Sequence, residues 1–223
     1  MSVVAHPPES PEDGLRAIKR RRAAIALHEA ALRLASGRSG DCTIDRITET
    51  ANLSSRTFFN YFATKEDAIL GLTDLTTPSE DDAILFTGAA LSGAESIVAG
   101  ARWVHRTIAS AFLVHANAEQ LARIVEQEPT LRRRVLTLHH DAESACRTAL
   151  RAVAHEDERL VVETHLTVAA AALRQALVGT FEGAPSRPIV DPTTFAACEE
   201  SVRAFARAVP MPTTEERTTR VEA

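Results

Sequence analysis

The sequence predicts an all-α protein with a small N-terminal helical domain followed by a larger one. Of the 223 residues, 45% are apolar but only 4% are aromatic. The apolar residues are mainly Ala, Leu and Val, which form helices or fill cores. They recur at helical spacing between breaks that contain Pro or Gly, and few stretches alternate as strands do. The length allows two domains, since a domain holds roughly 100–200 residues.

Apolar periodicity and helix-start signals predict nine helices. They span residues 15–36, 44–51, 55–61, 65–75, 94–115, 118–126, 129–153, 157–182 and 192–209. Thr64 can form a capping box with Asp67, and Asp191 precedes Pro192 at a first helical position. Residues 76–93, broken by one Pro and two Gly, predict a linker that contains a short helix.

These helices form two predicted domains, residues 15–75 and 76–210, between two polar ends. Residues 1–14 are rich in Pro and acidic side chains, so we expect a disordered arm there. Residues 211–223 predict a similar disordered tail. Together they leave two helical domains to carry the function.

The sequence also predicts a soluble, cytoplasmic protein with no membrane partner. No stretch approaches the roughly 18 apolar residues of a membrane span, and the N-terminus lacks the order of a signal peptide. Cys42, Cys146 and Cys198 are odd in number and far apart in the chain, which favours reduced thiols over disulfides or a zinc site.

Residues 43–65 are the most informative segment, because they predict two short helices joined by a tight turn. Ile47 and Ala51 share one face of the first helix. Asn52 can adopt the left-handed conformation that ends this helix. Ser54 can cap the next helix by accepting a backbone N–H from its first turn.

The second of these helices, residues 55–61, has an unusual outward face. Leu53, Phe58 and Phe62 predict its buried side. The outward residues mix donors, acceptors and aromatic rings, and they are Ser55, Arg56, Phe59, Asn60 and Tyr61. In a major groove, Arg pairs with guanine, Asn pairs with adenine, and an aromatic ring contacts a thymine methyl or the groove wall. This face therefore predicts sequence-specific binding to double-stranded DNA.

The charge distribution agrees with this prediction, although the net charge of the whole chain is -5. Residues 16–65 hold ten Lys and Arg against four Asp and Glu, a net +6, while the rest of the chain holds 15 against 26, a net -11. The basic run at residues 19–22 can contact phosphates or form an ordinary solvated helix face.

Over residues 25–70 the sequence resembles the tetracycline-repressor (TetR) family of bacterial regulators. The motif residues are Leu53-Ser54, Thr57-Phe58-Phe59-Asn60-Tyr61-Phe62 and Thr64-Lys65-Glu66. The resemblance implies an N-terminal three-helix helix-turn-helix domain, in which residues 43–51 support 55–61 as the recognition helix. It also implies a larger helical domain that binds a ligand and forms the dimer.

The resemblance further implies two kinds of DNA contact. Thr57, Tyr61 and Lys65 would hold phosphates, which set the register of the protein on DNA. The outward residues of the recognition helix would face bases or the groove wall. The predicted DNA-binding residues are Thr43, Ser54, Ser55, Arg56, Thr57, Phe59, Asn60, Tyr61 and Lys65. The implied function is a transcriptional repressor, released from a palindromic operator by a small apolar ligand.

Two late helices predict a homodimer, because each carries apolar residues at spacings of three and four that could meet their copies in a four-helix bundle. The predicted interface residues are Val162, Leu166, Leu173, Phe195, Val202 and Phe205.

Apolar side chains of the central helices are candidates for the effector pocket, since ligand pockets are mostly apolar with a few polar groups. They are Trp103, Phe112, Leu113, Ile124, Leu136 and Leu173. For any single one of these residues an ordinary core is the favoured alternative, and the sequence does not identify the ligand.

Other functional classes find little support. The adjacent His139 and His140 would point about 100° apart on a helix and could not chelate one ion together. We expect no metal and no cofactor. Phosphate-binding Gly loops, nucleophile elbows and zinc-protease motifs are missing, so we do not expect an enzyme. The remaining alternative is a helical interaction protein with a purely structural helix-turn-helix.

Overall fold

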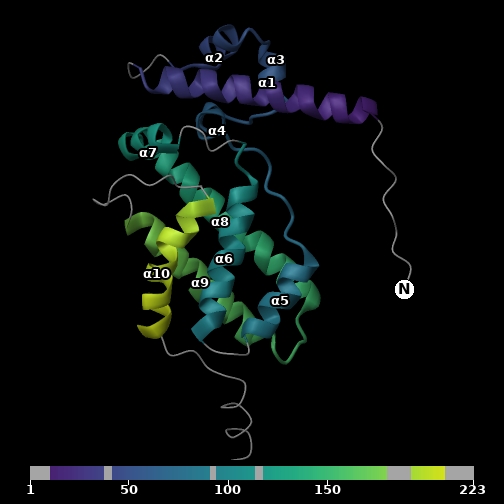
Figure 1. Ribbon diagram of the computed structural model, residues 1–223, viewed down its shortest axis with the longest axis vertical. Helices are drawn as coiled ribbons and strands as arrows, with labels where there is room; N and C mark the ends of the chain where they lie inside the picture. The colour runs from purple at the N-terminus through teal and green to yellow at the C-terminus, as the bar shows by residue number, and fades with distance from the viewer. Residues whose placement is uncertain (1–10, 38–41, 91–93, 114–117, 180–191, 209–223) are drawn as a thin grey trace, which may run out of the picture. The chain divides into compact units, whose positions relative to one another are not determined.

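The computed structural model describes all of the chain except residues 1–10, 38–41, 91–93, 114–117, 180–191 and 209–223 (Figure 1). Every regular element in the described ranges is a helix, which confirms the predicted all-α fold. The chain divides into two compact units, Met1–Thr73 and Asp74–Ala223. None of the described helices is both long and apolar enough to cross a membrane.

The first unit is built on one long helix. Its elements are α1 (Pro11–Ala35), α2 (Ile44–Ala51), α3 (Ser55–Phe59) and α4 (Lys65–Leu70). α1 packs against α2 and α4, and α2 packs against α3. The largest buried side chains are Leu27, Leu32, Ile47, Phe58, Phe62 and Leu70. Each of the four helices contributes at least one of these residues or directly precedes one, so the small unit has one shared apolar core.

Four helix bounds in this unit differ from the prediction, and the smallest difference is that α1 ends at Ala35 instead of residue 36. α1 begins at Pro11, so residues 11–14 are helical and the prediction of a disordered arm is wrong for them; Pro is favoured at a first helical position because it has no N–H to satisfy. α3 ends at Phe59 instead of residue 61. α4 ends at Leu70 instead of residue 75, because Gly71 adopts a left-handed conformation with φ 69°.

The second unit is arranged around a central helix, α6. Its elements are α5 (Glu80–Ala90), α6 (Ala94–Ser110), α7 (Ala118–Gln127), α8 (Pro129–Val153), α9 (Arg159–Gly179) and α10 (Pro192–Ala208) (Figure 1). α6 packs against α5, α8, α9 and α10. Gly100 permits close packing, since a Cβ there would lie 2.7 Å from the Ala169 Cβ and 2.8 Å from the Phe86 ring.

Two buried polar contacts fix α6 against its neighbours. Ser96 Oγ lies 2.6 Å from His165 Nδ1, which joins α6 to α9. Thr107 Oγ1 lies 3.4 Å from Cys146 Sγ, which joins α6 to α8. Both pairs are buried, so each satisfies polar atoms that would otherwise be costly to take out of water.

In the second unit, too, some helices differ in extent from the prediction. The stretch predicted as a linker with a short helix holds the 11-residue α5, whose first turn is capped where the Asp82 N–H donates to Ser79 Oγ at 3.1 Å. α6 ends at Ser110 instead of residue 115, and α9 begins at Arg159 instead of residue 157. The predicted ends at 182 and 209, the arm at 1–10 and the tail at 211–223 lie outside the described residues.

Candidate nucleic-acid interface

The turn between α2 and α3 has the geometry that the sequence predicts. Asn52 has φ 53° and ψ 46°, and it is the only non-glycine residue with positive φ in the described part of the chain. Its N–H donates to the Glu49 carbonyl at 3.1 Å, and the Leu53 N–H donates to the Thr48 carbonyl at 2.9 Å. These two bonds satisfy carbonyls at the end of α2 and turn the chain toward α3.

Both short helices begin with a side-chain cap. Thr43 Oγ1 accepts the Arg46 N–H at 3.3 Å at the start of α2. Ser54 Oγ accepts the Thr57 N–H at 3.1 Å at the start of α3, and the two hydroxyls lie 2.8 Å apart. The cap that the sequence predicts at Ser54 is confirmed, and it holds both polar side chains near the start of α3.

Two aromatic rings anchor α3 in the first unit. Phe58 is fully buried and Phe62 is 2% exposed, with their ring centroids 5.8 Å apart. Leu53, the third residue predicted to be buried, is only half-buried. Because α3 has just five residues, this anchoring and the cap determine which way its other side chains point.

The opposite face of α3 is open to solvent and chemically mixed. Ser55, Arg56 and Asn60 are exposed. Phe59 is 59% exposed, with its ring edge-on to Phe58 at a centroid distance of 5.4 Å and an interplanar angle of 84°. Tyr61, predicted to lie on this helix, falls in the turn after it and is half-buried. The face thus presents a cation, an amide, a hydroxyl and an aromatic ring without burying any of them.

The start of α4 adds an exposed cation next to this face in the sequence. Thr64 Oγ1 accepts the Asp67 N–H at 3.1 Å and donates to the Asp67 carboxylate at 2.8 Å, which confirms the predicted cap. Lys65 is the first residue of α4 and is exposed. Thr57 is half-buried, whereas Thr43 and Ser54 are exposed. All nine predicted DNA-binding residues therefore belong to the first unit, and each is at least partly accessible.

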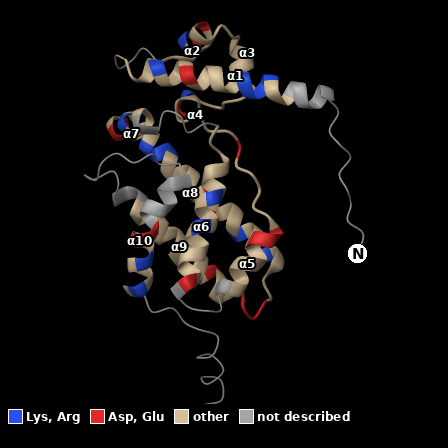
Figure 2. Cartoon of the chain, viewed as in Figure 1, with Lys and Arg blue, Asp and Glu red and all other residues tan. Residues whose placement is uncertain are grey.

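Four consecutive basic residues of α1, here called the basic band, lie in the same unit (Figure 2). Lys19, Arg20, Arg21 and Arg22 are consecutive, helical and all exposed. Four consecutive residues of a helix point in four directions around its axis, about 100° apart. The band therefore surrounds the helix with positive charge.

The residues predicted to bind an apolar effector do not form one set. Trp103, Phe112, Ile124 and Leu173 are buried, and Leu113 is half-buried. Leu136, on α8, is 42% exposed, and the assignment of these residues to an effector pocket stays a prediction. The sequence could not separate these residues, because core and pocket positions use the same apolar side chains.

Most of the apolar residues of α9 and α10 that were predicted to form the dimer interface are buried within the single chain. Val162, Leu166, Leu173 and Val202 are all buried in the single chain. α9 packs against α6 and α8, and α10 packs against α6 and α9, so these residues face helices of their own unit. The assignment of these four residues to a dimer interface is therefore corrected. Phe205 is half-buried, and the side chain of Phe195 lies outside the described residues.

Several histidines are buried, but the described residues contain no group of three or more His, Cys, Asp or Glu side chains that could hold a metal ion. His28 Nδ1 lies 2.9 Å from the Ala68 carbonyl oxygen in the first unit, and burial lowers the pKa of His28. Burial lowers the pKa of His105 to about 4 and, together with the charge of Arg174, that of His139 to about 4. These side chains are neutral core residues near pH 7.

A cavity lined mostly by polar residues lies in the second unit and was not predicted from the sequence. It lies between the segment before α5 and the C-terminal turns of α6. The available signal was the run Thr76-Thr77-Pro78-Ser79, in which three hydroxyl side chains precede an acidic helix start.

No protein-family model matches the chain, and no curated protein is significantly similar to it in sequence.

Proposed function

We propose that this protein is a sequence-specific DNA-binding transcriptional regulator. The observation that carries the proposal is the exposed face of α3, which presents Arg56, Phe59 and Asn60 beyond a capped and aromatic-anchored turn. A short helix held in this way, after a tight turn from a supporting helix, is the arrangement that places side chains in a major groove. The likeness of the motif residues to TetR-family regulators supports the same function.

In this proposal the exposed residues divide into two roles. Ser55, Arg56, Phe59 and Asn60 contact base edges or the groove wall, because they lie on the open face of α3 or at its end. Thr57, Tyr61 and Lys65 contact phosphates. Tyr61 and Thr57 are half-buried, which restricts their side chains and suits groups that fix the position of the protein on DNA.

The proposed active form is a homodimer on a near-palindromic operator, since a two-fold dimer presents equivalent recognition helices to two half-sites. Its interface uses residues other than Val162, Leu166, Leu173 and Val202, which their own chain buries. A small ligand that binds the free and DNA-bound conformations unequally would release the operator. We propose that the protein represses transcription, because its motif residues resemble those of TetR-family regulators.

The test is a binding experiment with duplexes selected from a random library and with DNA flanking the protein's own gene. Fluorescence anisotropy across a series of salt concentrations should give one preferred near-palindromic sequence. Its affinity should fall steeply with salt, because Lys and Arg displace counterions from phosphates. Failure to select any sequence, together with no salt-dependent binding, would overturn the proposal and favour a purely structural helix-turn-helix.

A further inference from the structure

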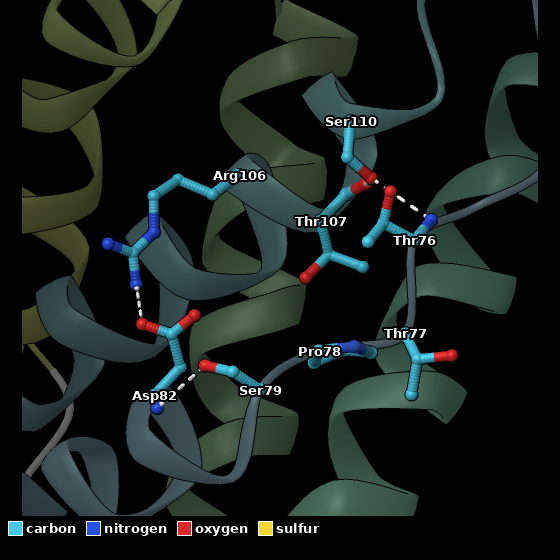
Figure 3. Close-up of a pocket in the computed structure, with 8 residues that line it drawn as sticks. All are labelled: Thr76, Thr77, Pro78, Ser79, Asp82, Arg106, Thr107 and Ser110. Carbon is cyan, nitrogen blue, oxygen red and sulfur yellow. Dashed lines mark hydrogen bonds and ion pairs between the residues drawn. The ribbon is translucent and has the colours of Figure 1, made fainter. Parts of the chain in front are cut away.

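The cavity in the second unit is lined by residues of the segment before α5, of α5 itself and of α6, and most of them are polar residues whose carbon atoms also contribute apolar surface. Thr76, Thr77, Pro78 and Ser79 come from the stretch before α5, and Thr107 comes from α6. Its volume is about 280 Å³, close to the lower limit of roughly 300 Å³ for small-molecule sites, so it fits a small ligand. Figure 3 shows an ion pair on one side of the cavity and hydroxyl groups on the others.

The ion pair makes the charge at the cavity wall nearly neutral. Arg106 Nη2 lies 2.6 Å from Asp82 Oδ1, with the two side chains 57% and 31% exposed (Figure 3). An anionic ligand that approached Arg106 would meet the Asp82 carboxylate, and a cationic ligand that approached Asp82 would meet the guanidinium. A neutral polar ligand meets neither repulsion, and it can still bond to the free donors of Arg106 and the free lone pairs of Asp82.

The hydroxyl groups supply both acceptors and donors. Thr107 is 6% exposed, and its Oγ1 donates to the Trp103 carbonyl at 3.1 Å and lies 3.4 Å from Cys146 Sγ, so one remaining lone pair of this oxygen can accept from a ligand. Ser110 Oγ donates to the Thr107 carbonyl at 2.7 Å and accepts the Thr76 N–H at 3.3 Å. Ser79 Oγ accepts the Asp82 N–H and keeps its proton available to donate.

From this arrangement we infer that the cavity binds a small neutral polyhydroxylated molecule of monosaccharide or cyclitol size. Each hydroxyl of such a ligand can donate and accept at once. It donates to the Asp82 carboxylate and to Thr107 Oγ1, and it accepts from Arg106 and Ser79. The ring of Pro78 gives an apolar surface for the C–H groups of the ligand. The ligand's role as the effector rests on the proposed function and replaces the apolar ligand that the sequence predicts, whereas its binding to the cavity does not depend on that function.

Trp103 provides an indirect fluorescence readout of binding, since it is the only tryptophan in the chain. It lies one helical turn before Thr107, and its ring packs 5.6 Å from Phe86, which follows Asp82 by one turn of α5. Trp103 is buried and does not line the cavity, so we expect a ligand to change its fluorescence only through Thr107 and Phe86, and the heat of binding reports binding independently.

The experiment titrates the full chain with D-glucose and with myo-inositol, and it records Trp103 fluorescence together with the heat of binding. D-glucuronate and D-glucosamine serve as charged molecules of similar size. We expect a saturable change at millimolar concentrations with at least one neutral ligand, and weaker binding of the charged ones. No saturable response to either neutral ligand, or tighter binding of a charged one, would overturn the inference.

Variants locate the site. Asp82→Asn and Arg106→Gln should each lower the affinity about tenfold, because each removes a hydrogen bond that involves a charged group. The matched control is Arg102→Gln, one turn earlier on α6, where Arg102 pairs with Glu199 at 3.2 Å outside the cavity. It should bind like the wild type. If the two cavity variants bind with the same affinity as the control, the inference is overturned. All three replaced side chains are at least partly exposed, and the melting temperature reports independently whether each variant folds.

Discussion

At the scale of single residues, conformation and burial explain what several side chains do. Asn52 is needed for its backbone conformation, because its φ of 53° is a region that most residues avoid. His139 shows the opposite case, a polar side chain in the core, where it is 2% exposed and its ring nitrogens have no hydrogen-bond partner among the described residues. Each residue allows a prediction about stability.

Replacing Asn52 with Ala should destabilise the protein by about 1–2 kcal/mol, the usual penalty for a left-handed residue with a Cβ. Asn52→Gly should be close to wild type, because Gly adopts this conformation without strain. Urea denaturation measures both. Thr50→Ala, at an exposed position of α2, is the control and should change stability by less than about 0.5 kcal/mol. Equal stability of the Ala and Gly variants would contradict the role assigned to the turn.

Acid should destabilise the second unit through His105 and His139. Their folded pKa of about 4 lies below the ordinary 6.5, so the unfolded chain binds more protons between these pH values. The free energy of unfolding should therefore fall as the pH drops from 6.5 toward 4, by up to about 1.4 kcal/mol per pH unit for each histidine.

The variant His139→Leu should show a shallower pH dependence of stability, since one of the two groups is gone. The neighbouring His140 is exposed, and His140→Leu should leave the slope as in wild type. Chemical denaturation at pH 7, 6 and 5 gives the slopes. A slope that His139→Leu does not change would show that burial of this ring does not couple folding to pH.

At the scale of helices, local signals predicted starts better than ends or partners. α2 and α8 have the bounds that the sequence predicts, and the caps at Ser54 and Thr64 are where their residue types favour them. α4 was predicted too long, because apolar periodicity continues beyond Gly71. The face of α3 followed from local spacing, since Phe58 and Phe62 can only pack on one side.

What the sequence could not decide was which surface each apolar stripe meets. The stripes of α9 and α10 pack against α6 within the chain, and a stripe that meets a second copy would have the same spacing. The polar cavity was equally hidden, because Ser79 and Thr107 come together only through the packing of α5 against α6.

Leu166 should therefore behave as a core residue and not as an interface residue. Leu166→Ala should destabilise the second unit by about 2–5 kcal/mol. Leu160 lies on the same helix but is 66% exposed, so Leu160→Ala should change stability by less than about 0.5 kcal/mol. Denaturation curves measure both, and light scattering follows the oligomeric state. A stable, monomeric Leu166→Ala protein would instead return this residue to the interface.

The basic band on α1 should contribute to DNA affinity without affecting sequence preference. Replacing Arg20, Arg21 and Arg22 together with Ala should reduce the dependence of log affinity on log salt, by about 0.9 for each phosphate that the protein no longer neutralises. The control replaces Arg132, Arg133 and Arg134 of α8, another run of three, with Ala. An equal salt dependence in both variants would identify the α1 band as a solvated face.

At the scale of the whole molecule, the charge is divided along the chain in a way that suits the proposed function. Residues 16–65 carry a net charge of +6, and the rest carries -11. A regulator with this division can place its first unit on DNA while the second unit is repelled from phosphates. A dimer doubles the basic surface, and its two recognition helices would meet half-sites about 34–36 Å apart or a multiple of that distance.

In the proposed function, the exposed face of α3 contacts bases while the start of α4 contacts the DNA backbone. These two contacts are tested by binding curves for wild type, Arg56→Ala and Lys65→Ala on the selected operator and on its single-base variants, at several salt concentrations. Lys65→Ala should weaken binding to all sequences alike and reduce the salt slope by about one unit per half-site. Arg56→Ala should cost roughly 1–3 kcal/mol at one base position and relax the preference there. An equal loss on every operator variant would contradict base contact by Arg56, and unchanged binding by both proteins would contradict DNA contact by this face.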